Sequence, residues 1–135
     1  MSPGSSVVES VGGHDAMHSE LKQFGDVREA DRSDEIDGVR PRYVIEPPSP
    51  EAVAELLAWA SRERVSTVLR GGGTKLGWGR RPKAIDLVVS TRRLSRVLAH
   101  PHGDLTATVE AGTTVRELNQ ALARHGQWLP VDVAF

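Results

Sequence analysis

The residue types best suited to chemistry gather in one glycine-rich, cationic stretch, residues 68–79 (VLRGGGTKLGWG). Three consecutive glycines, Gly71 to Gly73, follow a short apolar run. Glycine lets a ligand approach the bare main chain, and successive amides in such a loop can form an anion-binding concavity. No acidic residue lies between positions 70 and 83, where five basic residues occur: Arg70, Lys75, Arg80, Arg81 and Lys83. The stretch therefore predicts a site for a phosphate or diphosphate group.

This loop matches neither of the two best-known phosphate motifs. The Walker pattern needs a lysine directly after Gly77, where Trp78 stands. The dinucleotide pattern needs a third glycine at the position of Leu76. A turn without a ligand is the alternative interpretation, although a turn alone rarely needs five glycines and five cations together.

Size and composition limit the classes of protein that this chain can represent. A length of 135 residues favours one domain. The absence of cysteine excludes a disulfide framework and a thiol nucleophile. No apolar run approaches the roughly 20 residues that a membrane helix needs, and the first 30 residues lack the pattern of a secretory signal. We therefore expect a cytoplasmic protein without a membrane span.

Charge divides the chain into two parts. Residues 1–41 contain nine acidic and four basic side chains, whereas residues 42–135 contain nine acidic and thirteen basic ones. The beginning of the chain is also rich in Gly, Ser and charge, and such a composition buries too little apolar surface to offset the entropy of ordering. We therefore expect a poorly ordered acidic segment over residues 1–38 and a folded domain over residues 39–135.

The elements that hold the loop are predicted by the pattern before and after it. Residues 43–45 form a short strand, and Ser49 followed by Pro50 begins a helix that ends near residue 64. Strands follow at residues 65–69 and 84–90. The strands at 43–45 and 65–69, joined by the helix, are expected to form a parallel crossover. Apolar residues recur along the helix at the spacing of one buried face: Val53, Leu56, Leu57 and Ala60.

The C-terminal part predicts a hairpin and a second helix. Residues 96–99 and 105–110 are expected to pair as antiparallel strands, because the second segment alternates strictly between apolar and polar residues. Thr114 and Glu117 have the spacing of a capping box, and Gly126 occupies the stop position of the helix. The whole pattern predicts an α+β fold in which helices cover a small mixed sheet.

The run from Arg42 to Asp132 resembles the FAD-binding (PCMH-type) domain of the vanillyl-alcohol oxidase/p-cresol methylhydroxylase flavoprotein superfamily, and most of all its glycolate oxidase branch. The motifs that carry the resemblance are PRYVIEPPSPEAVAELL (41–57), VLRGGGTKLGWG (68–79), DLVVSTRRLSRVL (86–98), TVEAGTTVRELNQAL (108–122) and GQWLPVD (126–132). Their order and spacing agree over about 90 residues, which is far more specific than one glycine loop.

The resemblance implies a fold and a cofactor. The chain would be the first subdomain of such a domain, and its loop would bind the FAD diphosphate through main-chain amides. Pro130 and Asp132 would lie near the flavin. Thr74 stands where some relatives attach FAD covalently through a histidine, so non-covalent FAD is expected. The loop residues assigned to FAD are Arg70, Gly71, Gly72, Gly73, Thr74, Lys75, Leu76 and Gly77.

The resemblance also implies an activity. The chain would be the FAD-binding portion of an oxidoreductase that acts on a small 2-hydroxy acid such as glycolate, with companion oxidase subunits as possible partners. Relatives continue beyond the Leu-Pro-x-Asp segment, so a truncated or split reading frame would produce this chain. His100, His102 and His125 look isolated in the sequence, and we assign no catalytic residue and no metal site.

Two other interpretations are left open. The first is a non-enzymatic module that binds a nucleotide or another anion, with Trp78 as a stacking surface. An aromatic content of 4% and a net charge of -1 argue against nucleic acid as its ligand. The second is a non-functional remnant whose exposed sheet edge promotes aggregation.

Overall fold

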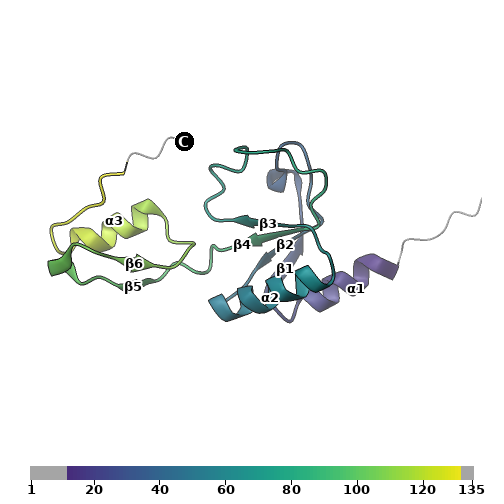
Figure 1. Cartoon of the computed structure of the whole chain (residues 1–135), viewed down its shortest axis with the longest axis horizontal. Helices are drawn as coiled ribbons and strands as arrows, with labels where there is room; N and C mark the ends of the chain where they lie inside the picture. The colour runs from purple at the N-terminus through teal and green to yellow at the C-terminus, as the bar shows by residue number, and fades with distance from the viewer. Residues whose placement is uncertain (1–11, 132–135) are drawn as a thin grey trace, which may run out of the picture.

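The chain forms two sheets and three α-helices in a computed structural model that describes residues 12–131 (Figure 1). The elements in order are α1 (Gly12–Leu21), β1 (Asp26–Glu29), η1 (Arg32–Asp34), β2 (Tyr43–Glu46), α2 (Pro50–Arg62), β3 (Thr67–Arg70), β4 (Leu87–Ser90), β5 (Val97–Ala99), η2 (His102–Asp104), β6 (Thr108–Val109) and α3 (Val115–Ala123). The predicted mixture of a small mixed sheet with helices is confirmed.

The larger sheet has the strand order β1-β2-β4-β3. Strands β2, β4 and β3 run parallel, and β1 pairs antiparallel with β2. The predicted crossover from β2 through α2 to β3 is confirmed. The two strands that this crossover connects are not neighbours, because β4 lies between them. All four residues of β4 are buried, as is typical of a central parallel strand covered on both faces. The C-terminal ends of the three parallel strands therefore meet at one edge: Glu46, Ser90 and Arg70.

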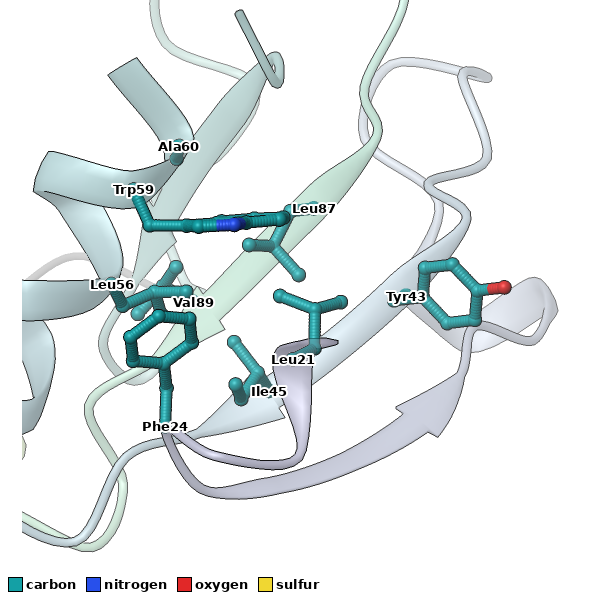
Figure 2. Packing of buried hydrophobic residues seen from close by; sticks show 9 residues of the cluster. All are labelled: Leu21, Phe24, Tyr43, Ile45, Leu56, Trp59, Ala60, Leu87 and Val89. Carbon is teal, nitrogen blue, oxygen red and sulfur yellow. The ribbon is translucent and has the colours of Figure 1, made fainter. Parts of the chain in front are cut away.

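Helices α1 and α2 cover one face of this sheet (Figure 1). Their apolar side chains form the larger buried cluster with those of the strands: Leu21, Phe24, Tyr43, Ile45, Leu56, Trp59, Ala60, Leu87 and Val89. Figure 2 shows the Trp59 ring reaching from α2 over the strand side chains, and its ring centroid lies 5.8 Å from that of Phe24. A smaller cluster lies on the other face, where chain segments rather than helices cover the sheet: Ile36, Val44, Ile85 and Val88.

The caps predicted for both later helices are confirmed. The Ser49 hydroxyl accepts a hydrogen bond from the Ala52 amide at 3.2 Å at the start of α2. Thr114 and Glu117 form the reciprocal capping box of α3. At the other end of α3, Gly126 has a φ of +67°, and its amide donates to the Ala123 carbonyl at 3.0 Å. This left-handed residue ends the helix without the strain that a side chain would add.

The beginning of the chain differs from the poorly ordered segment expected over residues 1–38. Residues 1–11 lie outside the described residues, but residues 12–38 contain α1, β1 and η1. Leu21 is fully buried, Phe24 is nearly so, and β1 extends the sheet at its β2 edge. Burial of a few apolar side chains against the face of the sheet offsets the entropy lost when this segment becomes ordered. The average composition of the segment does not reveal these few contacts.

The second sheet is the predicted antiparallel hairpin of β5 and β6, and it lies with α3 beside the larger sheet (Figure 1). The expected strand over residues 105–110 is shorter than predicted, because Leu105 takes a left-handed conformation with a φ of 55° directly after η2. Its side chain is 79% exposed rather than part of a buried face. None of the described helices is long and apolar enough to cross a membrane.

Candidate functional site

A polar cavity of about 470 Å³ lies at the C-terminal ends of β2, β3 and β4. Parallel sheets characteristically bind ligands at this edge. The glycine loop contributes one wall, the N-terminal part of the chain a second, and the connection before α3 a third. The lining residues are Arg28, Ser33, Asp34, Glu46, Arg70, Gly71, Gly72, Ser90, Arg92, Gly112 and Thr114.

The glycine loop begins where β3 ends, and its first residues present open main chain to this cavity. The Thr91 amide donates to the Arg70 carbonyl at 2.9 Å, which holds the end of β3 against β4. Within residues 12–131, the amides of Gly71, Gly72 and Gly73 take part in no backbone hydrogen bond. A Cβ atom placed on Gly72 would meet nothing within 4 Å. These exposed amides fit the diphosphate of FAD, which needs donors that internal pairing has not already used.

The remainder of the loop anchors it to the fold. The Leu76 side chain packs against the smaller buried cluster on the sheet, and the Lys75 ammonium lies 5.0 Å from the centroid of the Trp78 ring. Gly73 has a φ of +78°, which glycine adopts without a steric penalty. Arg70, Gly71 and Gly72 line the cavity, whereas Gly73, Thr74, Lys75, Leu76 and Gly77 are not among its lining residues. A contact of any of these eight residues with FAD stays a prediction.

The Arg70 guanidinium is held by the carboxylate of Asp34, a residue that was not predicted to belong to the site. Asp34 is only 2% exposed, and it accepts hydrogen bonds from Arg70 at 2.8 Å and from Arg28 at 2.6 and 2.9 Å. The Arg28 hydrogen bond, above all, holds the pKa of the Asp34 carboxyl well below its usual range. The charge of Arg70 is therefore compensated inside the protein.

Asp34 was missed because it falls in the segment expected to be poorly ordered. One signal was present in the sequence: Asp31 and Asp34 have the three-residue spacing of a capping box. In the structure Asp34 accepts from the Asp31 amide at 3.0 Å, and Asp31 accepts from the Ser33 amide at 2.7 Å. This turn fixes Asp34 at the edge of the cavity.

The third wall of the cavity is the connection between β6 and α3. Gly112 donates its amide to the Leu94 carbonyl at 2.7 Å, and a Cβ atom at Gly112 would overlap the Thr91 carbonyl oxygen. Only glycine permits this close approach. It brings Thr114, which caps α3, to the lining of the cavity.

Of the two C-terminal site candidates, Pro130 and Asp132, the structure describes Pro130 and places it away from the lining of this cavity. Pro130 is exposed in the segment after α3, where the Asn119 side chain accepts from the Leu129 amide at 2.7 Å. Pro130 does not belong to the residues that line the cavity, and Asp132 lies outside the described residues. Proximity of these two residues to a flavin stays a prediction.

The histidines that look isolated in the sequence lie together in the structure. The rings of His102 and His125 stack with centroids 4.4 Å apart, and His100 lies 5.2 Å from His125. The chain brings them together because the end of α3 returns to the hairpin, and sequence spacing alone gives no sign of that return. Over residues 12–131, no group of three or more His, Cys, Asp or Glu side chains is arranged to hold a metal ion.

Two curated proteins are similar to this chain over most of its length. The glycolate oxidase subunit GlcD of Bacillus subtilis is 32% identical over 92 residues, 68% of this chain and 20% of that protein. The D-2-hydroxyglutarate dehydrogenase of Xanthomonas citri is 34% identical over 94 residues, 70% of this chain and 20% of that protein. This chain thus spans about a fifth of the length of the curated relatives that it matches.

A solved structure shows the same fold. The berberine bridge enzyme of Eschscholzia californica superposes with a TM-score of 0.64 at 19% identity, covering 80% of this chain and 26% of that one. Residues 41–135 as a whole match the family described as FAD binding domain. The PCMH-type resemblance is thereby confirmed, and the chain belongs to the family of FAD binding domains found in FAD-linked oxidoreductases.

Proposed function

We propose that this chain is the FAD-binding portion of an oxidoreductase that oxidises a 2-hydroxy acid such as glycolate. The observation that carries the proposal is the open main chain of Gly71 and Gly72 at the ends of the parallel strands. The names of two relatives, a glycolate oxidase subunit and a D-2-hydroxyglutarate dehydrogenase, support this substrate class.

The residues of the chain would hold the cofactor rather than perform proton transfer. The amides of Gly71 and Gly72 would donate to the diphosphate, in a cavity whose side chains carry three arginines and two carboxylates. Bound FAD supplies two-electron redox chemistry. Thr74 at the position of the covalent attachment supports non-covalent binding. Companion oxidase subunits and a cytoplasmic location belong to the same proposal.

Replacement of Gly72 by alanine tests the cradle directly. The new methyl group would meet no protein atom within 4 Å, so the variant should fold normally. It would, however, stand where the diphosphate must approach the amides, and we expect FAD affinity to fall about tenfold or more through lost charge-assisted hydrogen bonds. The measurement is quenching of flavin fluorescence during titration, with thermal unfolding as the check on folding.

Gly103→Ala is the matched control. A Cβ atom at Gly103 also meets nothing within 4 Å, but this glycine lies in η2, away from the cavity. The control should bind FAD as the wild type does. Absence of FAD binding by the wild-type chain at micromolar concentration would refute the proposal, and binding of ADP without binding of flavin would favour a nucleotide-binding module instead.

The substrate class needs its own measurement. With FAD bound, anaerobic addition of glycolate or D-2-hydroxyglutarate should bleach the flavin absorbance if the chain, with any companion subunit, forms a complete active site. Loss of absorbance with an unrelated primary alcohol, and none with either acid, would contradict the proposed substrate while leaving FAD binding intact.

A further inference from the structure

Three arginines line the polar cavity, and they differ in how their charges are used. Arg28 and Arg70 both donate to the buried carboxylate of Asp34. The exposed guanidinium of Arg92, in contrast, forms no ion pair and no side-chain hydrogen bond with any residue between 12 and 131. Only its main-chain amide is engaged, with the Ser90 hydroxyl at 3.4 Å.

We propose that Arg92 is the side chain that binds the phosphate groups of the dinucleotide in this cavity, an inference that rests on the proposed function. The sequence alone favours Arg70 for this role, because Arg70 directly precedes the glycines. The ion pair of Arg70 with Asp34 makes it a structural residue of the cavity wall instead. The guanidinium of Arg92 is therefore the one of these three arginines that can bind an anionic ligand without first losing an ion pair.

Arg92 and the open amides follow the ends of two paired strands. Arg70 and Ser90 are partners in the parallel pairing of β3 with β4. Gly72 and Arg92 each stand two residues beyond those partners, at the same end of two adjacent strands, and both line the cavity. An anion held by the Gly71 and Gly72 amides therefore lies on the side of the cavity from which Arg92 comes.

The charges in the cavity favour the same residue. The carboxylates of Asp34 and Glu46 offset the charges of Arg28 and Arg70, so the net positive charge of the lining equals that of Arg92. The charge of a guanidinium that is paired with a buried carboxylate is largely offset, so it attracts an anion less strongly. A free guanidinium offers its planar set of N–H groups for bidentate contact with phosphate oxygens.

The test compares two neighbouring arginines in the full chain. Arg92→Gln should weaken FAD binding about tenfold, the effect of one lost charge-assisted contact. Arg93→Gln is the matched control, because Arg93 pairs with Asp26 on the surface and does not line the cavity. It should bind FAD as the wild type does. Flavin fluorescence titration measures both.

Two further readouts separate phosphate binding from a merely structural role. Added salt should weaken FAD binding by the wild type more than by Arg92→Gln, because the variant has already lost the screened attraction. Arg92→Lys keeps the charge and should keep most of that salt dependence. Riboflavin carries no phosphate, so its affinity should be the same for the wild type and Arg92→Gln.

The outcomes distinguish this inference from the proposed function. Equal FAD affinities of Arg92→Gln and Arg93→Gln, with the wild type binding FAD, would overturn the role of Arg92 and leave the function standing. A drop in affinity for FAD and riboflavin alike would also overturn it, because the loss would not concern phosphate. If the wild type binds no FAD, the proposed function fails and the role of Arg92 fails with it.

Discussion

The larger sheet with α1 and α2 (residues 12–90, the sheet unit) and the hairpin with α3 (residues 97–131, the hairpin unit) bury their apolar side chains very differently. Both faces of the larger sheet are packed, and eight of the hydrophobic core residues of the sheet unit are 2% exposed or less. In the described part of the hairpin unit, Leu122 is the buried apolar residue, whereas Leu105 and Trp128 are 79% and 71% exposed. The sheet unit therefore contains its own source of stability, and the hairpin unit does not.

The exposed apolar surface of the hairpin unit has a definite shape. Leu118 and Leu122 of α3, together with Leu105 and Trp128, line a groove of about 430 Å³. Clustered exposed apolar side chains are uncommon on monomeric proteins, unlike single ones. The comparison teaches that sequence patterns of equal quality can produce elements of unequal stability, because burial depends on what the rest of the chain places against them.

The largest predicted effect contrasts one tryptophan from each unit. Trp59→Ala removes a 5% exposed ring from the larger cluster, together with the hydrogen bond from its indole nitrogen to Glu20 at 2.9 Å. We expect the free energy of unfolding to fall by about 3 to 5 kcal/mol. Trp128→Ala should change it by less than about 0.5 kcal/mol. Urea unfolding followed by circular dichroism measures both, and equal losses would mean that Trp128 is packed in solution.

The second prediction concerns the buried charge of the sheet unit. Asp34→Asn should lower the free energy of unfolding by roughly 1 to 3 kcal/mol at neutral pH, because two arginines lose their shared carboxylate. Asp26→Asn removes an exposed partner of Arg93 and should cost less than about 1 kcal/mol. Chemical unfolding of the two variants beside the wild type provides the comparison.

The same pair predicts a pH dependence. The pKa of Asp34 is lowered in the folded state, mainly by the Arg28 hydrogen bond, so its ionisation stabilises the fold above the unfolded pKa of about 3.9. This contribution is lost as the pH falls below that value. The stability difference between wild type and Asp34→Asn should therefore be constant near neutrality and shrink below about pH 4. A difference that grows on acidification would contradict the assignment.

The smallest predicted effect compares the helix caps of the two units. Ser49→Ala and Thr114→Ala each remove a hydroxyl that accepts from the first turn of a helix, a loss of about 1 kcal/mol. Amide hydrogen exchange shows which part of the chain loses this stability. In Thr114→Ala, faster exchange should be confined to α3, whereas in Ser49→Ala the protected amides of the whole sheet unit should exchange faster. Identical patterns in both variants would remove the distinction between the units.

Local signals were sufficient for much of the fold. Ser49, Thr114 and Gly126 carry their own cap chemistry, so the helix ends could be placed from the sequence. The strands β2 and β4 could likewise be predicted, because each is a short run of apolar residues in the sequence. The position of β4 between β2 and β3 could not be predicted, because both strand orders satisfy the same local pattern and only the packing of the faces decides.

The site shows where such reasoning stops. The glycine run predicted open main chain at Gly71 and Gly72, since glycine composition is itself the signal. The pairing of Arg70 with Asp34 joins residues 36 positions apart, and the sequence gives no register between them. The role that we propose for Arg92 depends on that pairing, because it offsets the charge of Arg70.

The polar cavity takes its walls from both units: Arg70 and Asp34 from one, and the connection of Gly112 and Thr114 to α3 from the other. A ligand seated there keeps all its contacts only while both units are folded. By mass action its presence stabilises that joint state, by about 2.7 kcal/mol at one hundred times the dissociation constant. Bound cofactor would therefore couple the unfolding of the two units into one transition, and it would raise the melting temperature of the hairpin unit toward that of the sheet unit.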